Sequence, residues 1–355
     1  MQLRDLRKKV DGIDRRIVGL LNERTHLALK IGGLKIKAKG SIYVPERESS
    51  IYKTIESLNK GPLKNSTLKA VYREIMSGSL NIEKPLKIAY LGPQATFTHL
   101  ASLKKFGSSV TYVDCSNITD VFLDVEKGNA DYGVVPIENS TEGVINHTLD
   151  MFIDSDLKVC SEVILDIAHS LLGKCARGRI KRVYSKREVF GQCRMWLEAN
   201  LAGRDLIEVS STTKAAELAS KDRLGAAIAS SLAAERYKLK VLADSIQDSS
   251  HNITRFLVIG KTIAKPTGND KTSVMFSVND KIGALHDMLV PFKKYHINLT
   301  KIESRPSKKK AWEYYFFVDM IGHSESSKVK KALLSLKKRC SYIKILGSYP
   351  KGDLD

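Results

Sequence analysis

The sequence predicts a multidomain protein in which an all-α segment is followed by an α/β segment and then by a smaller α+β segment. Near the N-terminus, apolar residues recur with a 3-4 heptad spacing, which is typical of a long helix packed along one seam. From residue 86, strand-like and helix-like stretches alternate, as they do in α/β proteins. Over about 271–350 the expected order is βαββαβ, which is the order of elements in ferredoxin-like folds.

The composition is ordinary for a soluble globular chain, with 355 residues of which 43% are hydrophobic and 27% charged. No apolar run approaches the roughly 18 residues of a membrane helix, and the N-terminus lacks a signal core, so we expect a cytoplasmic protein with no membrane partner. The five cysteines are scattered, which predicts reduced thiols and no metal site. The net charge of +19 permits nucleic-acid binding, but no such motif is present, so small anions are the expected partners.

The first segment is expected to form three helices. The second begins near Glu46 and ends at Gly61-Pro62, and the third runs from about Asn65 to Glu83. The first extends over the apolar positions Leu3, Leu6, Val10, Ile13, Ile17, Leu20, Leu27, Ile31 and Leu34.

Arg24 falls on the apolar stripe of the first helix, where a buried charge needs a partner. An internal ion pair or a snorkelling side chain would also explain it. Arg7 and Lys35 share an adjoining flank but lie roughly 42 Å apart along the axis, too far for one small ligand. If all three cations serve one site, two antiparallel chains must contribute to it.

The run LRDLRKKVDGIDRRIVGLLNERTHLALKIGGLK, followed by YVPERES, resembles the all-helical chorismate mutase family. The resemblance implies an intertwined homodimer in which each site receives Arg7 from the other chain, and the expected assembly is a homodimer or a higher homo-oligomer. Catalytic roles are implied for Arg7, Arg24, Lys35 and Glu83, and substrate-binding roles for Arg47, Glu48 and Ser79. Many relatives carry aspartate where this chain has Val44, so a mutase segment that only dimerises is an alternative.

The middle segment contains VPIENSTEGVINHTLDMF at 135–152, a strand followed by a polar run. Backbone amides and short hydroxyls at such a junction suit the binding of a carboxylate. Together with YLGPQATFTHLA, VYSKREVFGQC and NITRFLVIG, this motif resembles prephenate dehydratase. The implied fold is of the two-lobed periplasmic-binding-protein type, with the substrate in the cleft between the lobes. The first lobe is expected from about 86–165 plus the return after about 245.

Within this resemblance, Thr254 is expected to assist departure of the substrate hydroxyl. Arg255 is expected either to bind a substrate carboxylate or to support the fold. The reaction needs orientation and hydrogen bonding rather than a cofactor. Ala95 replaces a glycine of the usual GPxGTFS pattern, and alanine tolerates a positive φ less well. The remaining implied substrate-binding residues are Asn139, Ser140, Thr141, Ser185 and Gln192.

The last segment resembles the ACT regulatory domain of prephenate dehydratases through Gly283-Ala284-Leu285 and NLTKIESRP at 298–306. The resemblance implies that phenylalanine binds between paired ACT domains. A ferredoxin-like dimerisation domain without a ligand is the alternative. The implied effector residues are Gly283, Ala284, Leu285, Asn298, Leu299, Glu303, Ser304 and Arg305.

We therefore expect a bifunctional enzyme of phenylalanine biosynthesis, which converts chorismate to prephenate and then to phenylpyruvate. The expected domains are residues 1–84, 86–264 and 271–350. The competing hypothesis is a non-catalytic, amino-acid-responsive binding protein. It leaves the cations of the first helix and the Thr254-Arg255-Phe256 motif unexplained.

Overall fold

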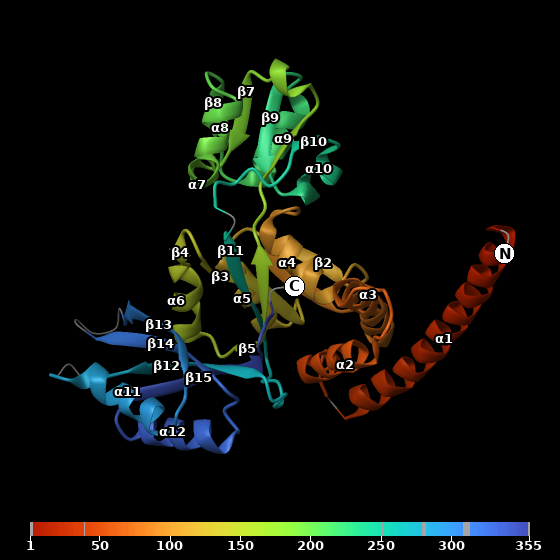
Figure 1. Ribbon diagram of the computed structural model, residues 1–355. Coiled ribbons are helices and arrows are strands. Elements are labelled where there is room, and N and C mark those ends of the chain that lie inside the picture. Colours follow the sequence, from red (N-terminus) through yellow and green to blue (C-terminus); the bar gives the residue numbers. More distant parts are fainter. Residues whose placement is uncertain (1–2, 39, 250, 279–281, 308–312, 354–355) are drawn as a thin grey trace.

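The computed structural model describes residues 3–38, 40–249, 251–278, 282–307 and 313–353. Figure 1 shows an extended N-terminal helix, a central body whose two sheets lie one above the other, and a third sheet at the C-terminal end. None of the helices in these ranges is long and apolar enough to cross a membrane.

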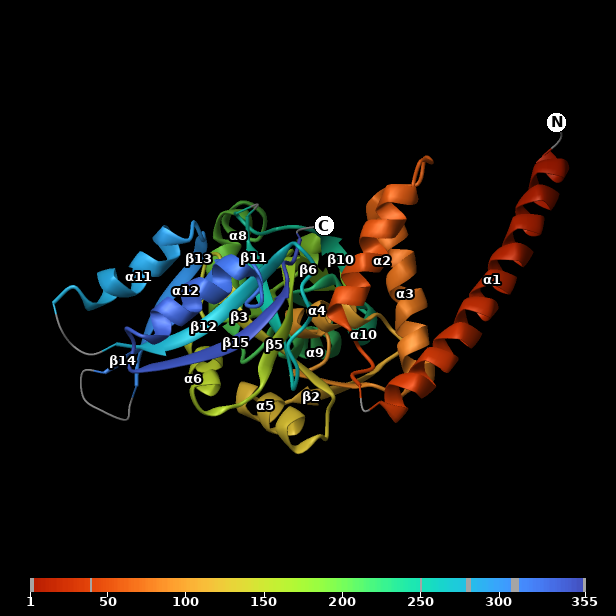
Figure 2. The ribbon, with the colours of Figure 1, turned by 90° about the horizontal axis from the view of Figure 1, so that it is seen from below.

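The N-terminal segment consists of three helices, α1 (Leu3–Lys37), α2 (Pro45–Leu58) and α3 (Asn65–Glu83). Most of α1 projects away from the body, and its C-terminal part meets α3 (Figure 2). The nine apolar positions of its predicted seam, from Leu3 to Leu34, are 45–67% exposed. Pro45 occupies the first turn of α2, where its missing N–H costs nothing.

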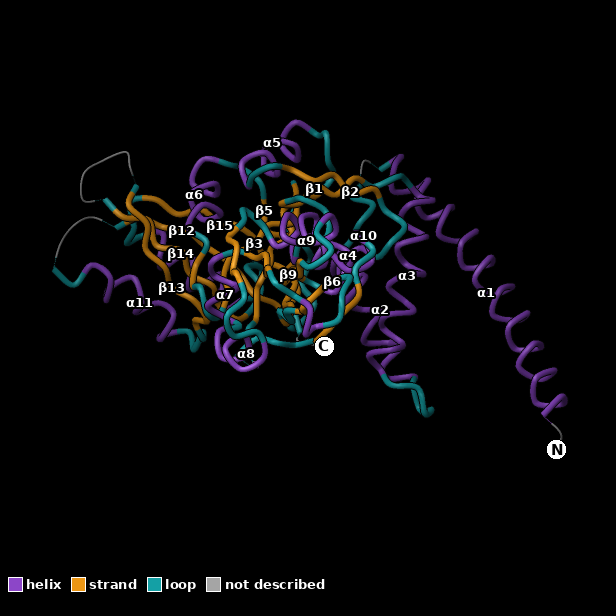
Figure 3. The backbone as a smooth tube through the Cα atoms, turned by 90° about the horizontal axis from the view of Figure 1, so that it is seen from above, coloured by secondary structure: helices purple, strands orange, loops and turns teal. Residues whose placement is uncertain are grey.

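The central body contains two lobes, each built on its own sheet, which Figure 1 shows one above the other. In the view from above, Figure 3, the strands of the two lobes overlap and α1–α3 lie to one side. The first has the order β2-β1-β3-β11-β5, with β4 beside β3, and its strands β1 to β3 are parallel while β11 is antiparallel to β3 and β5. Its elements are β1 (Lys87–Leu91), α4 (Phe97–Phe106), β2 (Thr111–Cys115), α5 (Ile118–Lys127), β3 (Tyr132–Asn139), β4 (Gly143–Val144), α6 (Asn146–Asp154), β5 (Lys158–Asp166) and β11 (Ile253–Gly260).

The second lobe is inserted between β5 and β11, so the chain passes twice between the lobes. Its sheet has the order β10-β6-β9-β7-β8. Its elements are β6 (Ser170–Gly173), a 3-10 turn (Arg177–Arg179), β7 (Arg182–Ser185), α7 (Arg187–Gln192), α8 (Arg194–Asn200), β8 (Asp205–Glu208), α9 (Thr212–Lys221), β9 (Gly225–Ala229), α10 (Ser231–Tyr237) and β10 (Lys240–Ala243).

The C-terminal segment has the order βαββαβ, with the four-stranded sheet β13-β14-β12-β15. Val274 and Val318 pack beneath the two helices, whereas Met275 and Phe317 share a core with Val135 of the first lobe. Strand β15 passes so close to β5 that a Cβ on Gly347 would lie 2.2 Å from the Val159 carbonyl oxygen. The sheet is therefore fixed against the first lobe. Its elements are β12 (Asp270–Ser277), α11 (Ala284–Lys294), β13 (Leu299–Pro306), β14 (Tyr314–Ile321), α12 (Ser327–Lys337) and β15 (Tyr342–Pro350).

Candidate functional sites

A cavity of about 100 Å³ lies where the end of α1 meets α2 and α3. It gathers most of the residues that the sequence predicts for the first site, and Val44 also lines it. Cations therefore converge on a small, partly apolar space that also contains a hydroxyl and two carboxylates. The predicted residues on its wall are Arg24, Lys35, Arg47, Glu48, Ser79 and Glu83.

Arg24, the cation on the apolar stripe of α1, has its hydrogen-bond partner in this cavity. The Arg24 guanidinium donates from Nη1 to Ser79 Oγ at 2.7 Å, and Ser79 donates in turn to the Ile75 carbonyl at 2.9 Å. The ammonium of Lys35 lies 3.1 Å from Glu83 Oε2 and donates to the Ile42 carbonyl at 2.8 Å.

Gly32 permits this arrangement because α1 and α3 touch there. A Cβ on Gly32 would lie 2.8 Å from Glu83 Cγ, well inside contact distance. Glycine thus allows the backbone of α1 to approach the Glu83 side chain closely.

Arg7 is the one predicted residue of this site that the cavity lacks. It lies on the exposed part of α1, 17 positions before Arg24 and so roughly 25 Å away along the helix. One chain therefore does not bring Arg7 to Arg24 and Lys35.

The second site is a polar network where β3 and β11 end at the junction of the lobes. Asn139 Nδ2 donates to Thr254 Oγ1 at 2.7 Å and to Asn252 Oδ1 at 2.8 Å. Its Oδ1 accepts the backbone N–H groups of Thr141 and Glu142, both at 2.9 Å. Two backbone donors fix which end of the Asn139 amide is oxygen, and the NH₂ group therefore faces Thr254.

Side chains from both lobes meet at this network. Gln192 of α7 donates from Nε2 to Glu142 Oε1 at 2.9 Å, and its Oε1 accepts from Asn252 Nδ2 at 3.0 Å. His169 Nε2 lies 2.7 Å from the same Gln192 oxygen. Burial lowers the pKa of His169, which favours a neutral imidazole here. A hollow of about 660 Å³, lined by Thr141, Gln192 and Arg187, opens beside these residues.

The turn at GPQATFT has a positive φ at Ala95, the position where the usual GPxGTFS pattern has glycine. Ala95 has φ +68°, a left-handed conformation that glycine would adopt without strain. Its carbonyl accepts from Ser230 of the second lobe at 2.9 Å, and its N–H donates to His99 Nδ1 at 3.1 Å. These contacts hold the turn between the lobes.

Two predicted residues of this site lie elsewhere. Ser185 is fully buried within the second lobe and donates to the Ile228 carbonyl at 2.9 Å. Arg255 follows Thr254 on β11 and therefore points to the opposite face of the sheet. Its guanidinium donates to Glu162 at 2.7 Å, to Asp319 at 2.5 Å and to the Tyr349 hydroxyl at 2.9 Å. Of the two roles expected for Arg255, these contacts favour support of the fold.

The effector residues predicted in the C-terminal segment lie at the start of α11, just after its end and along β13. Gly283 precedes the helix with φ +77°, and a Cβ there would meet nothing within 4 Å. Asn298 follows the helix, whose eleven residues span roughly 16 Å. Arg305 makes a two-pronged contact with Asp150 of α6, at 2.9 and 3.0 Å. One chain therefore does not gather all eight residues around one small ligand.

Comparison with known proteins covers all three segments. Residues 6–84 match the family chorismate mutase type II, residues 88–264 match prephenate dehydratase, and residues 272–338 match the ACT domain. A bifunctional chorismate mutase/prephenate dehydratase of Aquifex aeolicus is 53% identical over 99% of this chain and 98% of its own length. One from Pseudomonas aeruginosa is 43% identical over 99% of both chains.

The chain belongs to the bifunctional chorismate mutase/prephenate dehydratase family. The structure of a prephenate dehydratase from Arthrobacter aurescens, in complex with L-Phe, superimposes with a TM-score of 0.71. It is 33% identical in sequence, over 75% of this chain and 90% of that one.

Three residues at the dehydratase junction escaped the sequence analysis. Asn252 and Arg187 both lie inside motifs that had been recognised, next to residues that were assigned. His169 stands alone in the sequence, 23 positions before Gln192, and only the fold brings the two side chains together. No local pattern distinguishes it from a packed core histidine.

Proposed function

We propose that this chain rearranges chorismate to prephenate in the cavity of α1 to α3 and converts prephenate to phenylpyruvate at the junction of the two lobes. The similarity to bifunctional relatives along the whole chain carries this proposal. The three matched regions support domains at about 1–84, 86–264 and 271–350.

The rearrangement is pericyclic and needs no nucleophile, so positioning and charge supply catalysis. Arg24 and Lys35 offer guanidinium and ammonium donors to the carboxylates and the ether oxygen of chorismate. Chorismate is thereby held in its compact conformer, with charge stabilised on the breaking C–O bond.

The exposed seam of α1 supports an intertwined dimer. A helix with nine large apolar side chains 45–67% exposed needs a cover in water. An antiparallel copy would cover this stripe and bring Arg7 of the partner subunit to the cavity. The dimer thus completes the mutase site.

The dehydratase step expels CO₂ and the ring hydroxyl as the ring becomes aromatic. Asn139 donates to Thr254 Oγ1, which leaves the threonine hydrogen free to be donated to the departing hydroxyl. Arg187 supplies a cation to the hollow and is suited to a substrate carboxylate. Gln192 closes the hollow from the second lobe.

Thr254→Ala is expected to lower dehydratase kcat/KM about 100-fold, because a hydrogen bond made to the leaving group in the transition state is lost. Thr254→Ser should retain most activity, and mutase activity should be unchanged in both variants. Stopped assays of prephenate consumption and chorismate consumption measure the two separately. An alanine variant with wild-type dehydratase activity would contradict the role of Thr254.

Phenylalanine is the effector that the ACT match and the L-Phe complex of the Arthrobacter aurescens relative support. Pairing of two C-terminal sheets would bring Gly283 of one chain beside residues of the other. Feedback requires that phenylalanine prefer one conformation of the enzyme.

A coupled assay tests the whole proposal. Purified protein is incubated with chorismate, and prephenate and phenylpyruvate are followed separately, with and without phenylalanine. We expect both products, with phenylpyruvate suppressed by phenylalanine. If the protein turns over prephenate but not chorismate, the α1–α3 segment is a dimerisation unit, and Val44 is the first residue to test as the cause. If it turns over neither substrate, the binding-protein hypothesis is favoured.

A further inference from the structure

The loop that precedes α2 packs into the core of the first lobe as well as against the mutase helices. Ile42 and Tyr43 are 7% and 4% exposed and belong to a core cluster with Ile88 of β1 and Phe106 of α4. The Tyr43 ring lies 5.0 Å from the Phe106 ring and 5.2 Å from that of Tyr132. The position of this loop is therefore set by the first lobe.

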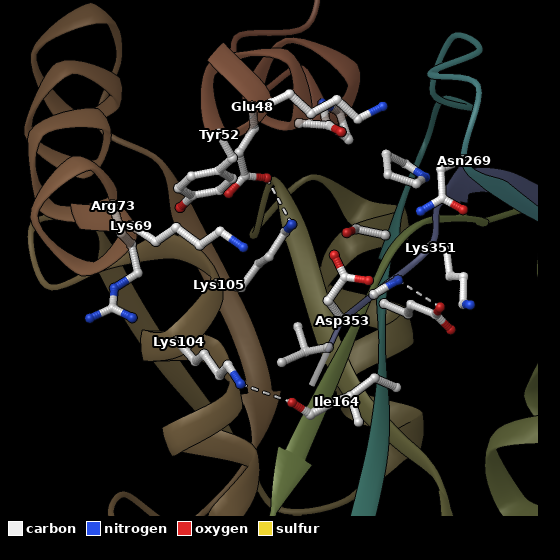
Figure 4. A pocket seen from close by; sticks show the side chains of 18 of the residues that line it. Glu48, Tyr52, Lys69, Arg73, Lys104, Lys105, Ile164, Asn269, Lys351 and Asp353 are labelled. Carbon is white, nitrogen blue, oxygen red and sulfur yellow. Dashed lines mark hydrogen bonds and ion pairs between the residues drawn. The ribbon is translucent and has the colours of Figure 1, made fainter. Parts of the chain in front are cut away.

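Glu48, one turn further on, is held by two partners on the same oxygen. Lys105, at the end of α4, places its ammonium 2.7 Å from Glu48 Oε2 (Figure 4). The Tyr43 hydroxyl donates to that oxygen at 2.8 Å. The side chains of Lys105 and Glu48 are 17% and 11% exposed, so solvent screens this pair only weakly.

Lys105 and Phe106 also line the mutase cavity itself, although both belong to the dehydratase part of the chain. A second, larger cavity of about 210 Å³ lies beside the first, and Glu48 and Lys105 line both. The ion pair thus forms part of the boundary between them.

We propose that Lys105 is a positioning residue of the mutase site, which fixes Glu48 for substrate and makes the first lobe part of that site. The inference rests on the proposed mutase function. Both contacts of Glu48 among the described residues use Oε2, which leaves Oε1 as an acceptor. Chorismate as a dianion has one hydrogen-bond donor, its ring hydroxyl, and this is the group that Oε1 would accept.

Charge gives a second reason for the lysine. A carboxylate in a cavity that receives a dianion repels its ligand unless a cation is close to it. Arg24 donates to Ser79 and Lys35 pairs with Glu83, whereas the cation in contact with Glu48 is Lys105. Lys105 offsets the charge of Glu48 from the wall that the two cavities share.

Lys105→Ala should lower mutase kcat/KM at least about tenfold, mainly through KM, because Glu48 binds a group that does not react. Lys105→Arg should restore most of the loss, since it keeps a donor and a charge at this place. Prephenate turnover by the same preparations reports on the fold of the first lobe and should stay within about twofold of wild type.

A double variant tests whether Lys105 acts through Glu48. Glu48→Gln combined with Lys105→Ala should lose little more mutase kcat/KM than Glu48→Gln alone, because the effects of coupled residues are not additive.

Lys104→Ala is the matched control. This neighbouring lysine donates to the Ile164 carbonyl at 3.1 Å and lines only the larger of the two cavities (Figure 4). It should leave mutase kcat/KM within about twofold of wild type. An equal loss in both lysine variants would show a general effect of charge and overturn the positioning role.

Two further results would overturn the inference in distinguishable ways. Lys105→Ala with full mutase activity, beside an active wild type, would remove the role of Lys105 and leave the proposed function intact. Wild-type protein that turns over prephenate but not chorismate would contradict the mutase function, and the role of Lys105 with it.

Discussion

Arg24→Ala is expected to lower mutase kcat/KM roughly 1,000-fold and to leave prephenate turnover unchanged. Arg24 lines the cavity where cations from α1 converge, and its guanidinium is already oriented by Ser79 at 2.7 Å. A preorganised charge needs no rearrangement when charge develops on the substrate, so its removal weakens the transition state directly. Initial rates with chorismate and with prephenate, measured on one preparation, give the mutase and the dehydratase kcat/KM.

Two variants sharpen the test of Arg24. Arg15→Ala removes the same charge from α1 nine positions earlier, where a helix presents its opposite face, and should change mutase kcat/KM less than about threefold. Arg24→Lys keeps the charge but not the planar fork and should fall between wild type and alanine. Equal loss of mutase and dehydratase activity in Arg24→Ala, with the fold intact, would contradict independent sites.

Only one residue of the mutase cavity could be predicted from a local pattern in the sequence. A cation on an apolar heptad stripe marks Arg24 without any knowledge of the fold. Its partner Ser79 lies 55 positions away, and only the resemblance to a family pointed to it. The start of α2 and the break between α2 and α3 followed from Pro45 and Gly61-Pro62, which restrict the backbone irrespective of packing, although α2 ends at Leu58, before that pair.

The contacts between segments could not be predicted in this way. Lys105 lies at the end of a helix of the first lobe, where a lysine is usually solvated. Its ammonium nevertheless lies 2.7 Å from Glu48 Oε2 of the mutase cavity. Arg255 and Thr254 are neighbours in one motif, but a strand turns successive side chains to opposite faces. What lies against each face depends on where the C-terminal sheet docks, and no local spacing encodes that.

Arg255→Ala should lower the thermal unfolding midpoint of the dehydratase and C-terminal segments by about 10 °C. Its guanidinium pairs with Glu162 and Asp319, which are nearly or fully buried. Burial alone would raise the pKa of Asp319, but Arg255 and the Ser273 hydroxyl lower it, so this carboxylate stays charged. Glu162 keeps its ion pair with Lys271 at 3.0 Å, but removing the arginine takes the ion-pair partner Arg255 from the buried Asp319. Breaking such a buried pair costs about 3–5 kcal/mol.

Arg182→Ala is the matched control for this prediction. Arg182 also makes a two-pronged contact with a carboxylate, Asp222, at 2.7 Å for both nitrogens, but its side chain is 40% exposed. Its loss should shift the unfolding midpoint much less than the loss of Arg255, because solvent screens an exposed ion pair. Differential scanning calorimetry of both variants gives the comparison.

Kinetics separate the two roles that the sequence allows for Arg255. If it supports the fold, KM for prephenate at a temperature well below the midpoint should stay within about threefold of wild type. Arg187→Ala, which removes the cation of the hollow, should raise that KM instead and leave the midpoint almost unchanged. If the Arg255→Ala protein has normal stability and a greatly raised KM for prephenate, Arg255 binds a substrate carboxylate instead. Its contacts with Glu162 and Asp319 would then have to open when prephenate binds.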